Sequence, residues 1–303
     1  MIGAAVLFSV ITGVAMAFQS PTNAVLGRVV GTLQASLTNF AVGFALCVIL
    51  VLAVGSGGIA GVTSVEPWKL LGGSYGVFII VCLVIATPKL GVVIMATMTM
   101  LGQLVAGMVV DGYGLMGCAV VEVSPLRVAG CVLVALGIFC EHLGSRTGWI
   151  GVDKTSTAVA YMALPFAAGV VGVLQPPTNA ALAASIGALE ATCVNFGVGL
   201  FILLVIVLVL NRGRLKSYKG AHAWQMTGGA YGVLGVVLAT VFSPVLGMSL
   251  WMAGTMLGQL LGASAIDSYG LLTLPKIGVN RYRIVGAVII AAGVIVVAIA
   301  KLM

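Results

Sequence analysis

Ten apolar segments, each about as long as a membrane-spanning helix, follow one another along this 303-residue chain. Apolar residues make up 61% of the sequence and charged residues only 7%, whereas about a quarter of an ordinary soluble protein is charged. So few charges cannot cover the surface of a water-soluble fold, and most of the surface must therefore face lipid. At about 20 residues per crossing, the chain has room for ten spans joined by short loops.

Windowed hydropathy predicts the boundaries of these spans. They lie at 3–22, 29–54, 70–87, 90–110, 126–141, 157–176, 182–210, 226–243, 246–266 and 283–302. The runs are continuous rather than alternating, which excludes a β-barrel, and an open sheet would leave backbone groups unpaired in lipid. The predicted fold is an all-α integral membrane protein. Ala15-Met16-Ala17 resembles a signal-peptidase site, but no Lys or Arg precedes it, so we expect the first span to be retained.

The cysteines and the basic isoelectric point point to no further chemistry. None of the cysteines forms a C-x-x-C pair, so we expect no zinc site, no disulfide framework and no cofactor. They are Cys47, Cys82, Cys118, Cys131, Cys140 and Cys193. The isoelectric point is near 9.3, yet no basic run carries interleaved aromatic residues, so nucleic acid is not an expected partner.

The chain contains the same pattern twice, at an offset of 156 residues and without gaps. Between positions 19 and 43, 13 of 25 residues are identical to those at 175–199. The pattern reads Q-x-P-T-N-A, N-F-x-V-G, W…G-G-x-Y-G, P-x-L-G, T-M-L-G-Q and D-x-Y-G-L in each copy. Each copy holds five predicted spans, and an odd number makes the second copy enter the membrane from the opposite side. We therefore predict two inverted five-helix repeats, at 1–148 and 149–303, an architecture typical of secondary transporters.

The loop charges predict an orientation. The loops after odd-numbered spans hold eleven of the 14 basic residues, and the other side holds three. The eleven are Arg28, Lys89, Arg146, Lys154, Arg212, Arg214, Lys216, Lys219, Lys276, Arg281 and Arg283, and the three are Lys69, Arg127 and Lys301. The side with eleven is predicted to be cytoplasmic, with both termini outside.

Amide side chains recur inside the predicted spans at repeat-related positions. A polar group in lipid is costly and marks either function or helix packing. The candidates for substrate binding are Gln19, Asn23, Gln103, Gln175, Asn179 and Gln259. Gln103 and Gln259 lie near the centres of their spans, which favours substrate lining. Gln19–Asn23 and its counterpart Gln175–Asn179 lie beside prolines expected to break or kink the helix, and either pathway lining or helix-end capping accounts for them. For Asn39 and Asn195 we expect interhelical hydrogen bonds.

Three carboxylates are candidates for gating or coupling: Asp111, Asp267 and Glu190. Asp111 and Asp267 end their spans, where an acid opposes the helix dipole, so something else must favour them. A salt bridge to Arg127 or Arg283 would do so, although a solvated interfacial acid is the preferred reading. Glu190 falls eight residues into the predicted span 182–210, and its counterpart is Gln34. We place Glu190 at the interface; a deep position would make it a proton-coupling candidate.

Together the repeated motifs resemble the YdcZ-like family of the drug/metabolite transporter superfamily, whose members typically have five spans. The resemblance covers about 2–140 and 158–300, so this chain looks like two members fused. It implies an inner-membrane protein with a central cavity lined by the first, third and fourth spans and by the sixth, eighth and ninth. The buried first-helix glutamate of the similar small multidrug resistance transporters is missing, and Gln19 occupies that region.

The leading hypothesis is a secondary transporter, an exporter, that moves a small polar or amphipathic metabolite by alternating access. Its partners would be a solute and the lipid bilayer, and a homodimer is left open. The alternative is a non-transporting scaffold or partner subunit. An intramembrane enzyme ranks last, because it would need a nucleophile, metal ligands or paired acids at depth.

Overall fold

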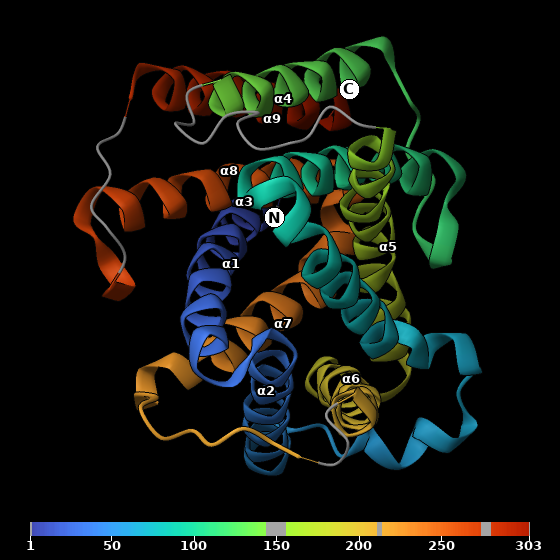
Figure 1. Ribbon diagram of the computed structural model, residues 1–303. Coiled ribbons are helices and arrows are strands. Elements are labelled where there is room, and N and C mark those ends of the chain that lie inside the picture. Colours follow the sequence, from blue (N-terminus) through green and yellow to red (C-terminus); the bar gives the residue numbers. More distant parts are fainter. Residues whose placement is uncertain (1, 144–155, 211–213, 274–279, 303) are drawn as a thin grey trace.

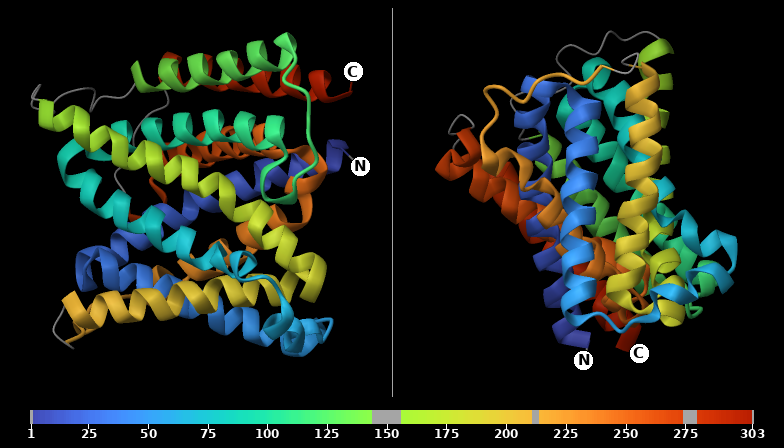
Figure 2. Two further views of the ribbon diagram at one scale, coloured as in Figure 1. Left: turned by 90° about the vertical axis from the view of Figure 1, so that its right-hand side faces the viewer. Right: turned by 90° about the horizontal axis from the view of Figure 1, so that it is seen from below.

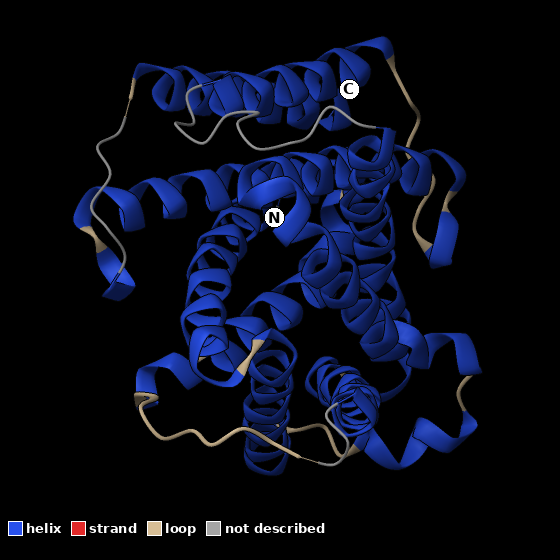
Figure 3. Ribbon diagram, viewed as in Figure 1, coloured by secondary structure: helices blue, strands red, loops and turns tan. Residues whose placement is uncertain are grey.

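The computed structural model describes residues 2–143, 156–210, 214–273 and 280–302, which form helices and connecting loops without a strand (Figures 1 and 3). The helices are α1 (Ile2–Val30), α2 (Thr32–Val54), α3 (Gly72–Tyr113), α4 (Pro125–Leu143), α5 (Ser156–Ile186), α6 (Ala188–Leu210), α7 (Gly228–Leu246), α8 (Met248–Tyr269) and α9 (Arg281–Leu302). Short 3₁₀ turns lie at Gly58–Ser64 (η1), Pro67–Leu71 (η2), Leu115–Gly117 (η3), Ala223–Met226 (η4) and Leu271–Thr273 (η5).

The all-α membrane fold is confirmed. Within the described ranges, seven helices are long and apolar enough to cross a membrane. Helix α3 has 42 residues, about 63 Å at 1.5 Å each and twice the ~30 Å hydrocarbon core. It doubles back part-way along its length (Figure 2), so it contains both predicted spans 70–87 and 90–110. Both termini lie toward one end of the helices (Figure 2), as an even number of crossings requires. The count of ten and the orientation remain predictions.

At the prolines where a break or a kink was expected, no break occurs. Helix α1 continues to Val30 past Pro21, and α5 continues to Ile186 past Pro176 and Pro177. Beside Pro21, the Thr22 hydroxyl adds a side-chain hydrogen bond to the Phe18 carbonyl at 2.8 Å. Membrane helices tolerate proline where neighbouring groups and local adjustments satisfy the freed backbone groups.

The breaks come instead at glycines with positive φ. Gly31 (φ 90°) separates α1 from α2, and its counterpart Gly187 (φ 101°) separates α5 from α6. Hydropathy predicted that the span 182–210 begins at residue 182, whereas α6 begins six residues later, at Ala188. Gly114 and Gly270 share a left-handed φ, as do Met116 and Leu272. The repeat in the sequence is therefore also a repeat in backbone geometry.

Helices from different repeats cross at paired glycines. A Cβ on Gly13 of α1 would overlap the Thr255 carbonyl of α8, and one on Gly258 would overlap the Val10 carbonyl. The repeat-related crossing joins α5 and α3 through Gly169 and Gly102. Such small residues let backbones approach closely in lipid, where apolar burial gives no driving force. Each repeat is thus held mainly by the other.

Helices α4 and α9 form a second symmetric contact. They lie side by side along one edge of the molecule (Figures 1 and 2). Gly130 faces Gly293, and Gly137 faces the Gly286 carbonyl. The residue number rises on one helix as it falls on the other, so the pair is antiparallel, as inverted repeats require for equivalent helices. The boundary predicted between 148 and 149 lies outside the described residues and remains a prediction.

Gly13→Ala is expected to destabilise the protein by about 1–3 kcal/mol, because the added methyl group overpacks the α1–α8 crossing. Gly3→Ala is the matched control on the same helix, since no atom lies within 4 Å of its added Cβ. Unfolding of purified protein in mixed detergent micelles measures both. Equal stability of the two variants would contradict the crossing.

Candidate functional site

A cavity of about 160 Å³ lies between helices of both repeats. It is lined from α1, both arms of α3, α5, α7 and α8, the helices that correspond to the six spans implied by the family resemblance. The lining residues are Thr12, Met16, Ile79, Gln103, Gly172, Gln175, Pro176, Asn179, Gly235, Val236, Ala239, Trp251, Met252, Thr255 and Gln259. None of them carries a formal charge.

Four of the six predicted substrate-binding residues line this cavity: Gln103, Gln259, Gln175 and Asn179. Gln103 and Gln259 are repeat-related and come from the facing helices α3 and α8. The Gln259 amide lies 3.7 Å from the Met16 sulfur. These two repeat-related glutamines, predicted near the centres of their spans, thus reach one cavity.

Gln19 and Asn23 do not line the cavity; both donate to Asn39 Oδ1 of α2, at 3.1 and 3.3 Å. In the second repeat, Gln175 and Asn179 donate likewise to Asn195 Oδ1, at 2.9 and 3.3 Å. The interhelical hydrogen bonds expected for the two central asparagines are confirmed.

The two amide triads are Gln19, Asn23 and Asn39 in the first repeat and Gln175, Asn179 and Asn195 in the second. Each triad packs against a glycine from the opposite repeat. A Cβ on Gly228 of α7 would overlap Oδ1 of Asn23, and one on Gly72 of α3 would overlap Oδ1 of Asn179. Gln175 also donates to the Gly72 carbonyl at 3.1 Å. The triads therefore connect the repeats to each other, and only the second triad also borders the cavity.

Two lining residues that sequence reasoning missed add chemistry to the cavity. Thr12 is fully buried, and its hydroxyl has no hydrogen-bond partner. Trp251 is 1% exposed and presents an aromatic surface. Their counterparts, Ala168 and Met95, lack these groups. No repeated signal marked them, because both break the internal symmetry.

Asp111 forms a buried ion pair with Arg127, so the preferred reading as a solvated acid was wrong. Asp111 is fully buried and Arg127 is 2% exposed. The carboxylate also accepts hydrogen bonds from the backbone N–H groups of Met248 and Ser249, at 2.5 and 2.8 Å. These two residues begin α8, and the positive end of that helix dipole favours a carboxylate. The helix that favours Asp111 is thus α8, not its own.

Arg127 also binds Ser249, its Nε lying 3.0 Å from the hydroxyl oxygen. The node therefore joins α3, α4 and α8, and sequence gave no sign of Ser249 because its counterpart is Val93. Nearby, burial and the Asp111 carboxylate raise the pKa of Cys118 to about 11, so this loop thiol stays neutral at physiological pH. The side chain of Asp267 lies outside the described part of the chain.

Glu190 is the third residue of α6 and is 1% exposed. Its carboxylate accepts hydrogen bonds from the Ser56 hydroxyl at 2.9 Å and the Gly57 N–H at 3.1 Å, in the loop after α2. Its counterpart Gln34 on α2 holds the loop after α6 through two 2.8 Å bonds to the Lys216 backbone. Glu190 and Gln34 each lie at the start of a helix and hold a loop of the opposite repeat by hydrogen bonds. We call these two contacts latches.

The chain matches the family model described as "Putative inner membrane exporter, YdcZ", over residues 4–140 and again over 160–296. The chain belongs to this family. It is therefore an inner-membrane transport protein with two copies of the family unit. No curated protein matched the chain. A solved structure titled "Crystal structure of protein" has a TM-score of 0.71 at 15% identity, covering 99% of this chain and 97% of that one, which shows a shared fold.

Arg127→Met and Asp111→Asn are each expected to cost about 3–5 kcal/mol of stability, because each leaves a buried charge without its partner. The double variant removes both charges and should cost less than the sum. Lys69→Gln is the control, since Lys69 pairs with Glu66, whose side chain is 64% exposed, and such a surface ion pair contributes at most about 1 kcal/mol. Denaturant unfolding of the four proteins measures this, and additive costs would refute the coupling.

Proposed function

We propose that this protein exports a compact, uncharged or zwitterionic metabolite by alternating access. The observation that carries the proposal is the cavity in which repeat-related glutamines from both halves meet, with no fixed charge around it. Amide and hydroxyl groups supply both donors and acceptors, which suits a solute without a strong net charge. Trp251 and the two methionines give that solute an apolar wall.

The size of the cavity favours a small solute. Water occupies about 30 Å³ per molecule, so 160 Å³ corresponds to roughly five waters, less than a typical drug pocket of about 300 Å³ or more. The unpaired Thr12 hydroxyl and the neighbouring amides provide the polar contacts that the solute would satisfy.

The asymmetry of the cavity supports alternating access. Gln175 and Asn179 line it, whereas their counterparts Gln19 and Asn23 do not. Exchanging the conformations of the two repeats would reverse these roles and move the cavity to the other side of the membrane. The Asp111–Arg127 ion pair and the two latches lie at helix ends. Such an exchange requires contacts at these ends to break and re-form.

Gln103→Ala and Gln259→Ala are expected to reduce solute export at least tenfold each, because each removes an amide at the centre of the pathway. Lys219→Gln, in an exposed loop, is the control. The readout is transport by proteoliposomes of metabolites that raise the melting temperature of the purified protein. Normal transport by both single variants and by the double variant would refute this site.

A second prediction separates transport from the scaffold alternative. In a cysteine-free background, Thr255→Cys lines the cavity, and Thr99→Cys is its repeat counterpart. We expect a membrane-impermeant thiol reagent to modify the two from opposite sides of the membrane. A scaffold with a packed interior would protect both, and modification of both from the same side would contradict alternating access.

A further inference from the structure

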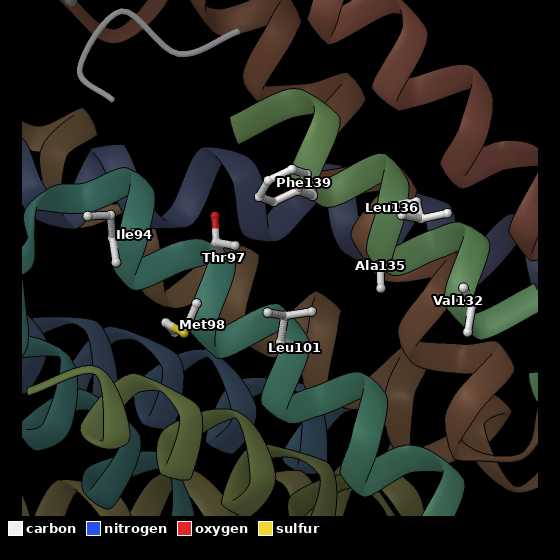
Figure 4. A pocket seen from close by; sticks show the side chains of 8 residues that line it. All are labelled: Ile94, Thr97, Met98, Leu101, Val132, Ala135, Leu136 and Phe139. Atoms are coloured by element: carbon white, nitrogen blue, oxygen red, sulfur yellow. The ribbon is translucent and has the colours of Figure 1, made fainter. Parts of the chain in front are cut away.

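A second hollow, unrelated to the central cavity, opens between the C-terminal arm of α3 and α4 (Figure 4). Its volume is about 430 Å³, and it is lined by Ile94, Thr97, Met98, Leu101, Val132, Ala135, Leu136 and Phe139. Thr97 alone among these has a polar side chain. On α4, Val132, Leu136 and Phe139 are each about half exposed, so the groove is open along its length.

The groove is long enough to hold part of a lipid acyl chain. Val132 and Phe139 are seven residue steps apart, about 10 Å along the helix, which fits within one leaflet of ~15 Å. In the second repeat, the counterparts of Thr97 and Met98 lie differently: Ala253 is fully buried, and Gly254 packs against Ser9 of α1.

Positive charge lies at one end of this groove. The antiparallel register of α4 and α9 places Phe139 and Cys140 beside the start of α9, and the Cys140 thiol donates a weak bond to the Tyr282 carbonyl at 3.7 Å. Arg281, the first residue of α9, is exposed, and its guanidinium lies 5.1 Å from the centre of the Tyr282 ring. Arg283 follows two residues later. The apolar groove suits the acyl chain of a lipid, and the basic residues at the start of α9 suit an anionic headgroup.

We propose that this groove binds an anionic phospholipid, with one acyl chain between α3 and α4 and the phosphate beside Arg281. The fixed walls give the chain packing contacts that bulk lipid lacks, and the arginine selects the headgroup. The lipid fills the hollow between α3 and α4 and so supports the α4–α9 pair.

The test measures binding of phosphatidylglycerol and phosphatidylcholine with identical chains to the full-length purified protein, by native mass spectrometry and by the shift in melting temperature. We expect phosphatidylglycerol to bind more tightly. Val132→Trp should fill the groove and reduce binding of both lipids at least tenfold. Val288→Trp, its exposed repeat counterpart, should bind as the native protein does. Leu136→Trp serves as a second groove-filling variant.

Arg281→Gln should weaken phosphatidylglycerol binding about fivefold, corresponding to ~1 kcal/mol per basic residue, and leave phosphatidylcholine unchanged. Lys219→Gln is the charge-matched control. Unchanged binding by both groove-filling variants would overturn the proposal. So would a dimer of the native protein that Val132→Trp converts to a monomer, since a second copy would then cover the groove.

Discussion

The fold depends on the lack of any hydrophobic driving force between helices in lipid. Association has to come from close van der Waals contact and from hydrogen bonds. The chain supplies the first at Gly13–Gly258 and at Gly169–Gly102, and the second at the amide triads around Asn39 and Asn195. All of these contacts except the hydrogen bonds within a triad join one repeat to the other. Separated halves would lose most of what holds them.

This constraint explains why polar residues in the spans divide into two roles. Asn39 and Asn195 each accept hydrogen bonds from two amide groups and so join neighbouring helices. Gln103 and Gln259 are left facing a cavity because the close glycine crossings beside them bring α3 and α8 to the centre. The packing residues thus position the site, and changes at a crossing glycine would act on both stability and transport.

The sequence predicted the helical class and the repeat. Of the six residues predicted to bind substrate, four line the cavity. These predictions were possible because apolar continuity and repeated motifs are local or periodic signals. The sequence did not predict that α1 and α5 continue past their prolines, or the start of α6, which depends on the positive φ of Gly187. It named Arg127 as a possible salt-bridge partner of Asp111, but it missed the two backbone N–H groups that also hold the carboxylate. The carboxylate meets the start of α8, 137 residues away, and no spacing rule reports such a contact.

The differences between the repeats carry as much information as their likeness. A symmetric pair of halves would have two equivalent latches, yet one holds its loop with an amide, Gln34, and the other with a carboxylate, Glu190. The cavity has Trp251 and Thr12 on one side, where the counterparts are Met95 and Ala168. The residues that are identical in the two repeats form the contacts that both repeats share. The residues that differ make the two sides of the cavity chemically unequal. A fused chain permits this divergence, because each repeat can change without altering the other, whereas a dimer of identical five-helix units cannot.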